Sequence, residues 1–343
     1  MNIKFRIRTA AAAGAAALGL SLLAAPASAD PIPATDFRQL VGVGSDTTQD
    51  IGNALGLAIT DPNNNPSSRL IASYDATGST PIKTRALNCV ITRPNGSSAG
   101  VDALRNNTGC IDFARSSRGP VDVTTNRLTW IPFAKDAVTI AVRSDSALRD
   151  GVGFTTAQLT DIYHCVPSAL TRTYSTPSGP VLITLKPLLP HAGSGTRTFF
   201  LEKIGVTEAQ VGTCVNATVQ PNDGTALTDS GHIAPYSIAQ YIAQTAGVTT
   251  DRHGAAVLTP VNGVQPRIAG RLNMAFPYAH DVYNVVPTAK LTGGATPDAD
   301  LIGAFQTSPL APAKVCLQTA RIEQHGFGPI GAACGNTSIK GER

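Results

Sequence analysis

The sequence predicts an α/β protein of about two domains. Segments typical of strands and of helices alternate through most of the chain, which favours an α/β architecture with mainly parallel strand pairing. A chain of 343 residues is long enough for about two domains with sizeable cores. Hydrophobic residues make up 42% of the chain and charged residues 15%, and this composition excludes an intrinsically disordered protein.

The order of strand, Gly-Ser loop and helix occurs three times. Residues 40–43 are predicted to form a short buried strand, and the helix after the next loop carries Ile51, Leu55 and Ile59 at intervals of four residues. The other two strands and loops are residues 89–92 with 96–98, and residues 181–185 with 193–196.

The remaining elements follow from local pattern. A fourth polar turn at residues 112–120 places two arginines around two serines. We also expect strands at 137–142 and 281–286, a helix at 156–163 capped by Thr155 or Thr156, a loop at 216–234, a last helix at 313–323 and a frayed tail at 338–343.

The first residues have the pattern of a secretory signal peptide. Lys4, Arg6 and Arg8 precede an apolar run, and small residues end at Ala29, after which we place the cleavage. The signal is therefore residues 1–29. No cysteine lies near the cleavage point to accept a lipid, and no later apolar run is long enough to span a membrane, so we expect a secreted or periplasmic protein.

The charge of the mature chain argues against nucleic-acid binding. The signal holds three of the 27 basic residues, which leaves 24 basic against 23 acidic residues in the mature chain. A nucleic-acid-binding protein is expected to keep a strong basic excess.

Six cysteines in an exported chain favour disulfides. Six cysteines allow 15 pairings, and we predict the sequential one, Cys89 with Cys110, Cys165 with Cys214, and Cys316 with Cys334. None of them forms a CxxC arrangement, and the six histidines include no pair four residues apart, so we predict neither a metal nor a cofactor.

The Gly-Ser loops have the chemistry of an oxyanion site. A helix start presents backbone N–H groups without intrahelical partners at the positive end of the helix dipole. Glycine lets the backbone approach a ligand, and serine or threonine adds a hydroxyl donor. The alternative reading of each loop is a simple helix cap.

Four segments resemble, in the same order, the phosphate-binding proteins of ABC importers, the PstS-like members of the type 2 periplasmic substrate-binding superfamily. They are residues 42–47, 95–100, 112–118 and 193–197, and residues 159–163 and 276–278 extend the likeness. The resemblance implies two α/β lobes with two hinge crossings, near 133–142 and 275–285. The first lobe would comprise 30–136 and 278–343, and the second 137–277.

The resemblance also implies a function and a set of contacts. The protein would capture phosphate or a related oxyanion for uptake through an ABC permease, as a monomer and not as an enzyme. The expected ligand contacts are Ser45, Asp46, Thr47, Ser97, Ser98, Arg115, Ser117, Ser194, Gly195 and Thr196.

The sequence departs from the family at its charged positions. Ser117 stands where the family usually has an aspartate, and Pro190 and Ala192 stand where it has an arginine and an aspartate. We therefore expect Arg115 or Arg118 to supply the cation, and Asp46 or Asp112 to accept the proton of phosphate.

Two other functions compete with this one. Residues 96–100 fit G-x-S-x-G with Ser98 as a hydrolase nucleophile, and Asp251 with His253 or His280 would complete a triad. Residues 93–95 separate the strand from the glycine by more than a nucleophile elbow allows. The third reading is a secreted interaction protein on the same scaffold, which has lost transport.

Overall fold

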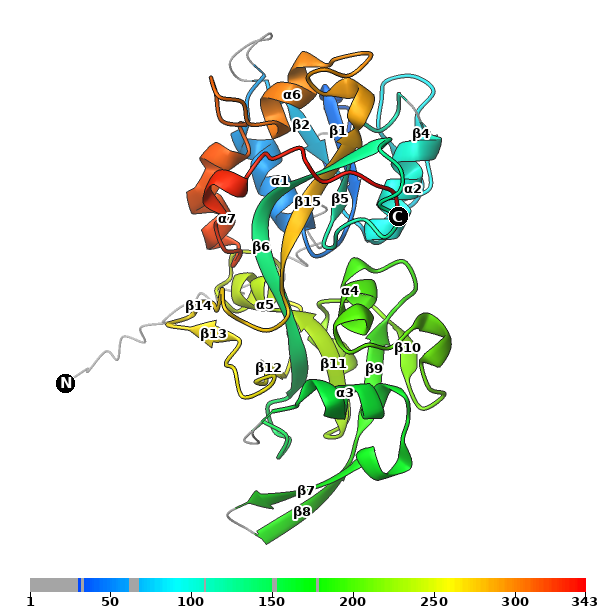
Figure 1. Ribbon diagram of the computed structural model, residues 1–343, viewed down its shortest axis with the longest axis vertical. Coiled ribbons are helices and arrows are strands. Elements are labelled where there is room, and N and C mark those ends of the chain that lie inside the picture. Colours follow the sequence, from blue (N-terminus) through cyan, green and yellow to red (C-terminus); the bar gives the residue numbers. More distant parts are fainter. Residues whose placement is uncertain (1–29, 32–33, 62–67, 108, 150–152, 177–178) are drawn as a thin grey trace, which may run out of the picture.

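The computed structural model describes residues 30–31, 34–61, 68–107, 109–149, 153–176 and 179–343, so the predicted signal peptide lies outside the described residues. The chain forms two α/β lobes joined by two long strands, as predicted (Figure 1). None of the helices in these ranges is long and apolar enough to cross a membrane.

The first lobe takes elements from both ends of the chain. Its elements are β1 (Leu40–Gly44), α1 (Gln49–Ala58), β2 (Ile71–Ser73), β3 (Ile82–Lys83), β4 (Val90–Ile91), α2 (Ser97–Asn106), β5 (Phe113–Ser116), α6 (Ala299–Phe305) and α7 (Thr319–Gln324), with short 3₁₀ helices at Thr288–Lys290, Cys316–Gln318 and Gly331–Ala333.

The second lobe comes from the middle of the chain. Its elements are α3 (Thr156–Tyr163), β7 (Thr171–Thr176), β8 (Gly179–Thr184), β9 (Lys186–Pro190), α4 (Gly195–Lys203), β10 (Asn216–Val219), β11 (His232–Ser237), α5 (Ile238–Thr245), β12 (Ala256–Leu258), β13 (Arg267–Ile268) and β14 (Arg271–Leu272), with 3₁₀ helices at Pro167–Ala169, Glu208–Gln210 and Gly224–Ala226.

Two strands join the lobes, β6 (Leu128–Arg143) and β15 (Ala279–Pro287). The order in the main sheet is β10-β9-β11-β6-β15-β5-β1-β2, and β12 adds to β6. β6 pairs with β15 up to Ala137 and with β11 from Val138 onward. This exchange of partners marks the crossing, and on it we base the proposed lobe boundary at 136/137.

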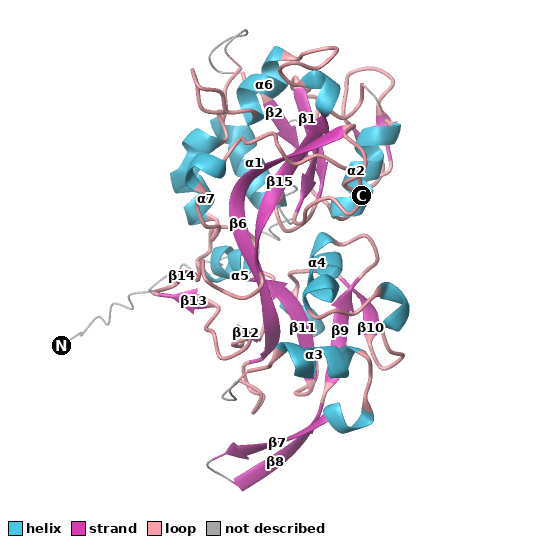
Figure 2. Ribbon diagram, viewed as in Figure 1, coloured by secondary structure: helices cyan, strands magenta, loops and turns pink. Residues whose placement is uncertain are grey.

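Helices cover both faces of the strands in the first lobe (Figure 2). On one face, Ile51 and Leu55 of α1 pack with Ile131 of β6. On the other face, Val101 of α2 packs with Trp130 of β6. Neighbouring strand residues point to opposite faces, so β6 supplies both cores with apolar side chains.

The helix at 156–163 begins where its cap was predicted. Thr155 accepts a hydrogen bond from the backbone N–H of Gln158, and the Gln158 side chain accepts one from the N–H of Thr155. This reciprocal capping box satisfies two backbone donors at the helix start.

Four sequence predictions were wrong in detail. The strand leading into residues 193–196 is β9, because residues 181–185 fall mostly in β8, which pairs with β7 in a separate ribbon. Residues 113–116 form β5 inside the predicted turn, and β10 and β11 occupy much of the predicted loop at 216–234. Four of the eight pairings in the described main sheet are antiparallel, so pairing is not mainly parallel.

The predicted frayed tail is ordered. Residues 338–343 run along the first lobe and make isolated bridges from Glu342 to Asp122 and from Lys340 to Thr129. Tail composition cannot reveal such bridges, because their partners lie about 200 residues earlier in the chain.

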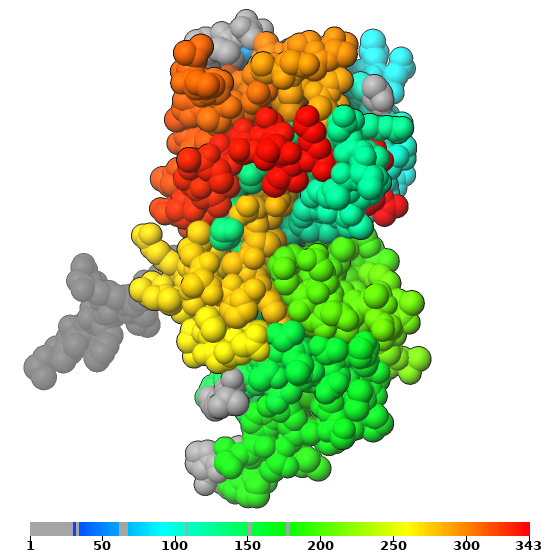
Figure 3. All heavy atoms as spheres, viewed as in Figure 1, coloured from blue at the N-terminus to red at the C-terminus, as the bar shows by residue number. Residues whose placement is uncertain are grey.

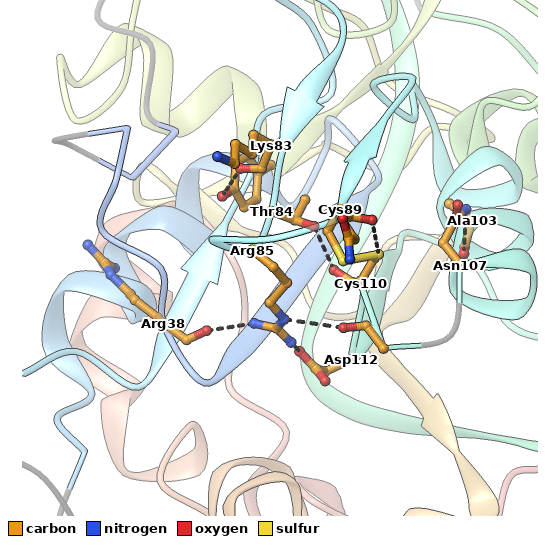
Figure 4. Close-up of a disulfide and its surroundings, with 12 residues drawn as sticks. Arg38, Lys83, Thr84, Arg85, Cys89, Ala103, Asn107, Cys110 and Asp112 are labelled. Atoms are coloured by element: carbon orange, nitrogen blue, oxygen red, sulfur yellow. Dashed lines mark hydrogen bonds and ion pairs between the residues drawn. A yellow bond between two sulfur atoms is a disulfide. The ribbon is translucent and has the colours of Figure 1, made fainter.

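All six cysteines pair sequentially, as predicted. Cys89–Cys110 joins the segment after β3 to the segment after α2 (Figure 4). Close by, Arg85 donates to the carbonyl of Arg38 over 2.7 Å and pairs with Asp112, which also accepts the backbone N–H of Val41. The carboxylate of Asp112, which directly precedes β5, is thus paired with Arg85 and hydrogen-bonded to β1.

Candidate functional site

The four predicted loops meet where the two lobes face each other. Loop 1 is residues 45–48 after β1, loop 2 is 95–98 at the start of α2, loop 3 is 116–118 at the end of β5, and loop 4 is 193–196 at the start of α4. β1 and β5 are parallel neighbours, so the loops that follow them leave the same edge of the sheet.

Side chains of the four loops contact one another directly. The Thr47 and Thr196 hydroxyl oxygens lie 3.2 Å apart across the lobes. In the first lobe, Ser97 Oγ lies 3.4 Å from Ser117 Oγ and accepts the backbone N–H of Ser117 over 3.1 Å. Ser98 N donates to the carbonyl of Gly193 over 3.1 Å, which joins loop 2 to loop 4.

Two glycines permit this close approach. A Cβ on Gly195 would lie 2.2 Å from Ser97 Oγ and 2.4 Å from Ser117 Oγ. Gly96 has φ +105°, and a Cβ there would lie 2.6 Å from the carbonyl oxygen of Gly193. Any side chain at either position would hold the loops apart.

The predicted contacts are all removed from solvent. Ser45, Thr47, Ser97 and Ser194 are fully buried, Ser98 is 6% exposed, and the other members of the set are buried as well. The hydroxyls of Ser45 and Thr48 are buried without a hydrogen-bond partner among the described residues. Buried hydroxyls are nearly always satisfied by protein or by ordered water, so these two can bind a water or a polar ligand.

Arg115 does not face the loops' hydroxyls. Its guanidinium donates to the carbonyls of Ser45, Gly42 and Tyr74 and to Ser73 Oγ, at 2.7 to 3.4 Å. Burial lowers the pKa of Arg115 to about 10. The side chain therefore ties β1 to β2 beneath loop 1.

Arg118 lies beside loop 2. Its Nη2 donates to Ser98 Oγ over 3.0 Å, and its Nη1 donates to the carbonyl of Gly119 over 2.8 Å. Its Nε is buried with no partner in the described part of the chain. Burial lowers the pKa of Arg118 to about 10. An anion that approaches would therefore stabilise the charged form of this side chain.

Arg197, the arginine in the loop 4 motif, is already paired. Its guanidinium forms a salt bridge with Glu208 at 2.6 Å, and Nη1 donates to the carbonyl of Pro190 over 2.9 Å. This contact with the backbone of Pro190 lies at one of the positions where the family usually carries charge.

Asp46 is buried beside loop 4. Its Oδ2 accepts a hydrogen bond from Asn222 Nδ2 over 2.9 Å. Burial raises the pKa of this carboxyl to about 6, while Asn222, Arg252 and His191 oppose the rise. The side chain can accept a proton near neutral pH and donate one below it.

Two residues of the second lobe were missed by sequence reasoning. Asn222 also donates to Thr47 Oγ1 over 3.0 Å, and Gln240 Nε2 donates to the carbonyl of Thr47 over 2.7 Å. Only the turn-forming Pro-Asn-Asp run at 221–223 could have drawn attention to Asn222. Gln240 lies in the first turn of α5 and carries no local signal.

The hydrolase residues do not assemble. Ser98 Oγ accepts from Arg118, whereas His253 pairs with Asp251 beyond α5 and packs on Tyr241. His280 instead packs against Phe199. Within the described ranges, no group of three or more His, Cys, Asp or Glu side chains is placed to hold a metal.

Two α/β lobes linked by paired strands, with polar loops meeting between them, define a two-lobe binding protein of the type 2 class. The model of the PBP superfamily domain matches residues 32–294, and the chain belongs to that superfamily. This confirms the resemblance predicted from the loops at the level of superfamily and fold.

Solved structures share this fold at low identity. A candidate phosphate ABC transporter substrate-binding protein with bound phosphate from Clostridium perfringens is 14% identical, with a TM-score of 0.54, over 85% of this chain and 99% of that one. An ABC-type phosphate transport receptor from Vibrio cholerae is 16% identical, with a TM-score of 0.51, over 84% and 99%. No curated protein matches the sequence.

We expect Asp46 to lower stability as pH rises. Its pKa is about 6 when folded and 3.8 in the reference state, so its stabilising effect is complete below pH 3.8 and lost as pH rises through 6. The free energy of unfolding of Asp46→Asn, relative to that of wild type, should therefore rise by about 2 to 3 kcal/mol from pH 4 to pH 7. Urea unfolding in chloride-based buffer measures this, with Asp161→Asn at an exposed position of α3 as control. A difference that is independent of pH would contradict the expectation.

Arg115→Met should reduce stability strongly. It removes the Arg115 donors from the carbonyls of Ser45 and Tyr74 and from Ser73 Oγ, whereas the carbonyl of Gly42 keeps the backbone N–H of Tyr74. We therefore expect a loss of about 3 kcal/mol or more in the free energy of unfolding. The exposed Arg271→Met is the matched control and should leave the unfolding curve unchanged. An unfolding midpoint for Arg115→Met equal to that of wild type would show that these hydrogen bonds contribute little.

Proposed function

We propose that the protein binds a small tetrahedral oxyanion, phosphate first, between its lobes. The observation that carries this proposal is the convergence of three glycine-serine loops and the serine-rich loop 3, with buried hydroxyls on Ser45 and Thr48 that have no partner among the described residues. Three of these loops open helices, so their backbone N–H groups add donors at the positive ends of α1, α2 and α4.

Arg118 is the cation that we assign to this site. Arg115 and Arg197 donate to backbone carbonyls and to Glu208, whereas Arg118 keeps a buried Nε that finds no partner in the described part of the chain. An arginine that already contacts Ser98 of loop 2 can turn this donor to an oxyanion at little cost in side-chain entropy.

Asp46 is the acceptor that we assign for the proton of phosphate. Phosphate near neutral pH still carries a proton, whereas sulfate is fully ionised. An ionised Asp46 accepts a hydrogen bond from the P–OH group of phosphate, and its negative charge repels sulfate, which has no proton to donate. Ser117, at the family's usual acceptor position, can both donate and accept and so discriminates little.

Closure of the lobes would complete the site. Thr47 of loop 1 contacts Thr196, Asn222 and Gln240 of the second lobe, so every one of these contacts forms or breaks as β6 and β15 bend. The proposal thus includes a hinge motion without any covalent step. The contact of Ser98 with Arg118 in place of a histidine favours binding over hydrolysis.

Export and transport are part of the proposal. The signal-like residues 1–29 and the three disulfides support a secreted or periplasmic location. The two solved proteins of the same fold are described as phosphate transport proteins, which supports delivery to an ABC permease.

The direct test is thermal melting of the mature protein with phosphate, sulfate, molybdate and small carboxylates. A ligand that binds only the folded state raises the melting temperature, and we expect phosphate at millimolar concentration to raise it most. Calorimetry should then give micromolar or tighter binding, about −8 kcal/mol or better. If none of the anions produces a heat of binding or a shift in melting temperature, the proposal is refuted.

Selectivity should depend on the charge of Asp46. We expect wild type to prefer phosphate over sulfate at pH 7.5 and to lose part of that preference at pH 5, where Asp46 is protonated and can donate to sulfate. Asp46→Asn should show weak selectivity at both pH values. Competition titrations measure this, and strong selectivity that survives in Asp46→Asn would place the acceptor elsewhere.

A further inference from the structure

The last residues of the chain form a strap across the first lobe. Backbone N–H groups of Val121 and Asp122 donate to the carbonyl of Glu342 over 3.0 and 3.1 Å, and Glu342 N donates to Asp122 over 2.7 Å. Figure 3 shows this red C-terminal segment lying across the face of the lobe and meeting the segment near residue 120. We call residues 339–343 the C-terminal strap.

Gly341 places the strap between residues 120–122 and the start of β6. Its N–H donates to the carbonyl of Leu128 over 3.1 Å, and its carbonyl accepts Trp130 Nε1–H over 3.0 Å. Its φ is +149°, and a Cβ would lie 2.4 Å from the carbonyl oxygen of Asp122 and 2.8 Å from Cβ of Pro120. The strap therefore fits closely against the residues that directly follow loop 3.

Trp130 connects the strap to Arg118. The indole is fully buried, and the Arg118 Cζ lies 5.9 Å from the centre of its ring, within the range of a cation–π interaction. The hydrogen bond to Gly341 fixes the rotation of the indole, and the indole in turn limits where the guanidinium can lie. Arg118 is thereby held on one side by Trp130 and on the other by Ser98 Oγ.

The end of the strap is attached to α2, the helix that begins with loop 2. Arg343 Nε donates to Asp102 Oδ1 over 2.6 Å, and Glu342 lies 3.5 Å from Arg105. The strap therefore contacts both the residues after loop 3 and the helix that carries Ser98. Movement of the strap would shift both partners of the contact between Arg118 and Ser98.

We infer that the C-terminal strap positions Arg118 for the anion through Trp130, an inference that rests on the proposed function. A free arginine side chain has many rotamers, and ordering it during binding weakens affinity. The stacked indole and the strap order it in advance. Trp130 and Gly341 are then positioning residues, and neither has to touch the ligand.

A double-mutant cycle tests this inference. Phosphate affinity is measured by calorimetry for wild type, Trp130→Phe, Arg118→Met and the double variant. We expect Trp130→Phe to weaken binding about fivefold and Arg118→Met about thirtyfold, because loss of one partner of a desolvated charge pair has about that effect. In the double variant, Trp130→Phe should add no further loss. The inference is overturned if Trp130→Phe weakens phosphate binding equally in wild type and in Arg118→Met, or if it does not weaken binding in wild type.

A second variant acts on the strap itself. Gly341→Val forces the strap away from Asp122 and should weaken phosphate binding about as much as Trp130→Phe does. Gly331→Val is the matched control, because Gly331 also has positive φ, at +54°, but its Cβ would meet no atom within 4 Å. If the two variants lose the same stability and only Gly341→Val loses phosphate affinity, the result supports the positioning of Arg118 by the strap. If the two variants bind phosphate with the same affinity, the inference is overturned.

Failure of the proposed function gives a different result. In that case wild type binds no oxyanion, and the same cycle is measured on the free energy of unfolding. Trp130 is the only tryptophan in the chain, so its fluorescence also reports on the contact directly. Coupling between Trp130 and Arg118 then supports the strap's hold on the arginine, whereas strict additivity with an unchanged Trp130 spectrum overturns it.

Discussion

The rest of the structure depends on one strand, β6, that pairs with strands of both lobes. β6 runs for 16 residues and exchanges β15 for β11 between Ala137 and Val138. At this point Asp136 accepts Ser237 Oγ and the backbone N–H of Ala239, which fixes the start of α5 against the crossing. Gln240, one turn into α5, then reaches loop 1. The position of the second lobe's polar groups thus follows from hydrogen bonds on a single strand.

The chemistry of the site is set by which charges are already neutralised. A buried guanidinium needs partners for its donors, and Arg115 finds them in backbone carbonyls while Arg197 finds a carboxylate. Arg115 stands beside the two serines of loop 3 and Arg197 follows the glycine-serine run of loop 4, yet both hold the scaffold together. The described residues that face each other across the lobes include hydroxyls, the carboxylates of Asp46 and Asp50 and the guanidinium of Arg252, and Arg118 is the cation that we propose for the anion. Such a site can recognise an anion mainly by shape and hydrogen bonds.

The sequence predicted the fold class, the loops and the disulfide pairing, because each depends on local signals. Glycine and serine before a run such as Ile51 and Leu55 are visible at short range. Asn222 could not be found in this way, since its role depends on a contact with Asp46, 176 residues earlier in the chain. The same limit applies to Arg115, whose carbonyl partners lie on β1 and β2, and to the tail, whose order comes from residues 120–130. Local pattern identifies elements, whereas the direction in which a buried polar side chain points is decided by packing between them.

The three disulfides have a consequence for how the molecule can move. Cys89–Cys110 and Cys316–Cys334 both lie in the first lobe, and Cys165–Cys214 lies in the second. Each cross-link removes conformational entropy from the unfolded chain of its own lobe, but none of the three disulfides joins one lobe to the other. Oxidative folding can therefore make each half rigid without adding any resistance to bending at β6 and β15. The disulfides can therefore raise the stability of each lobe while the hinge motion that we propose breaks and strains none of them.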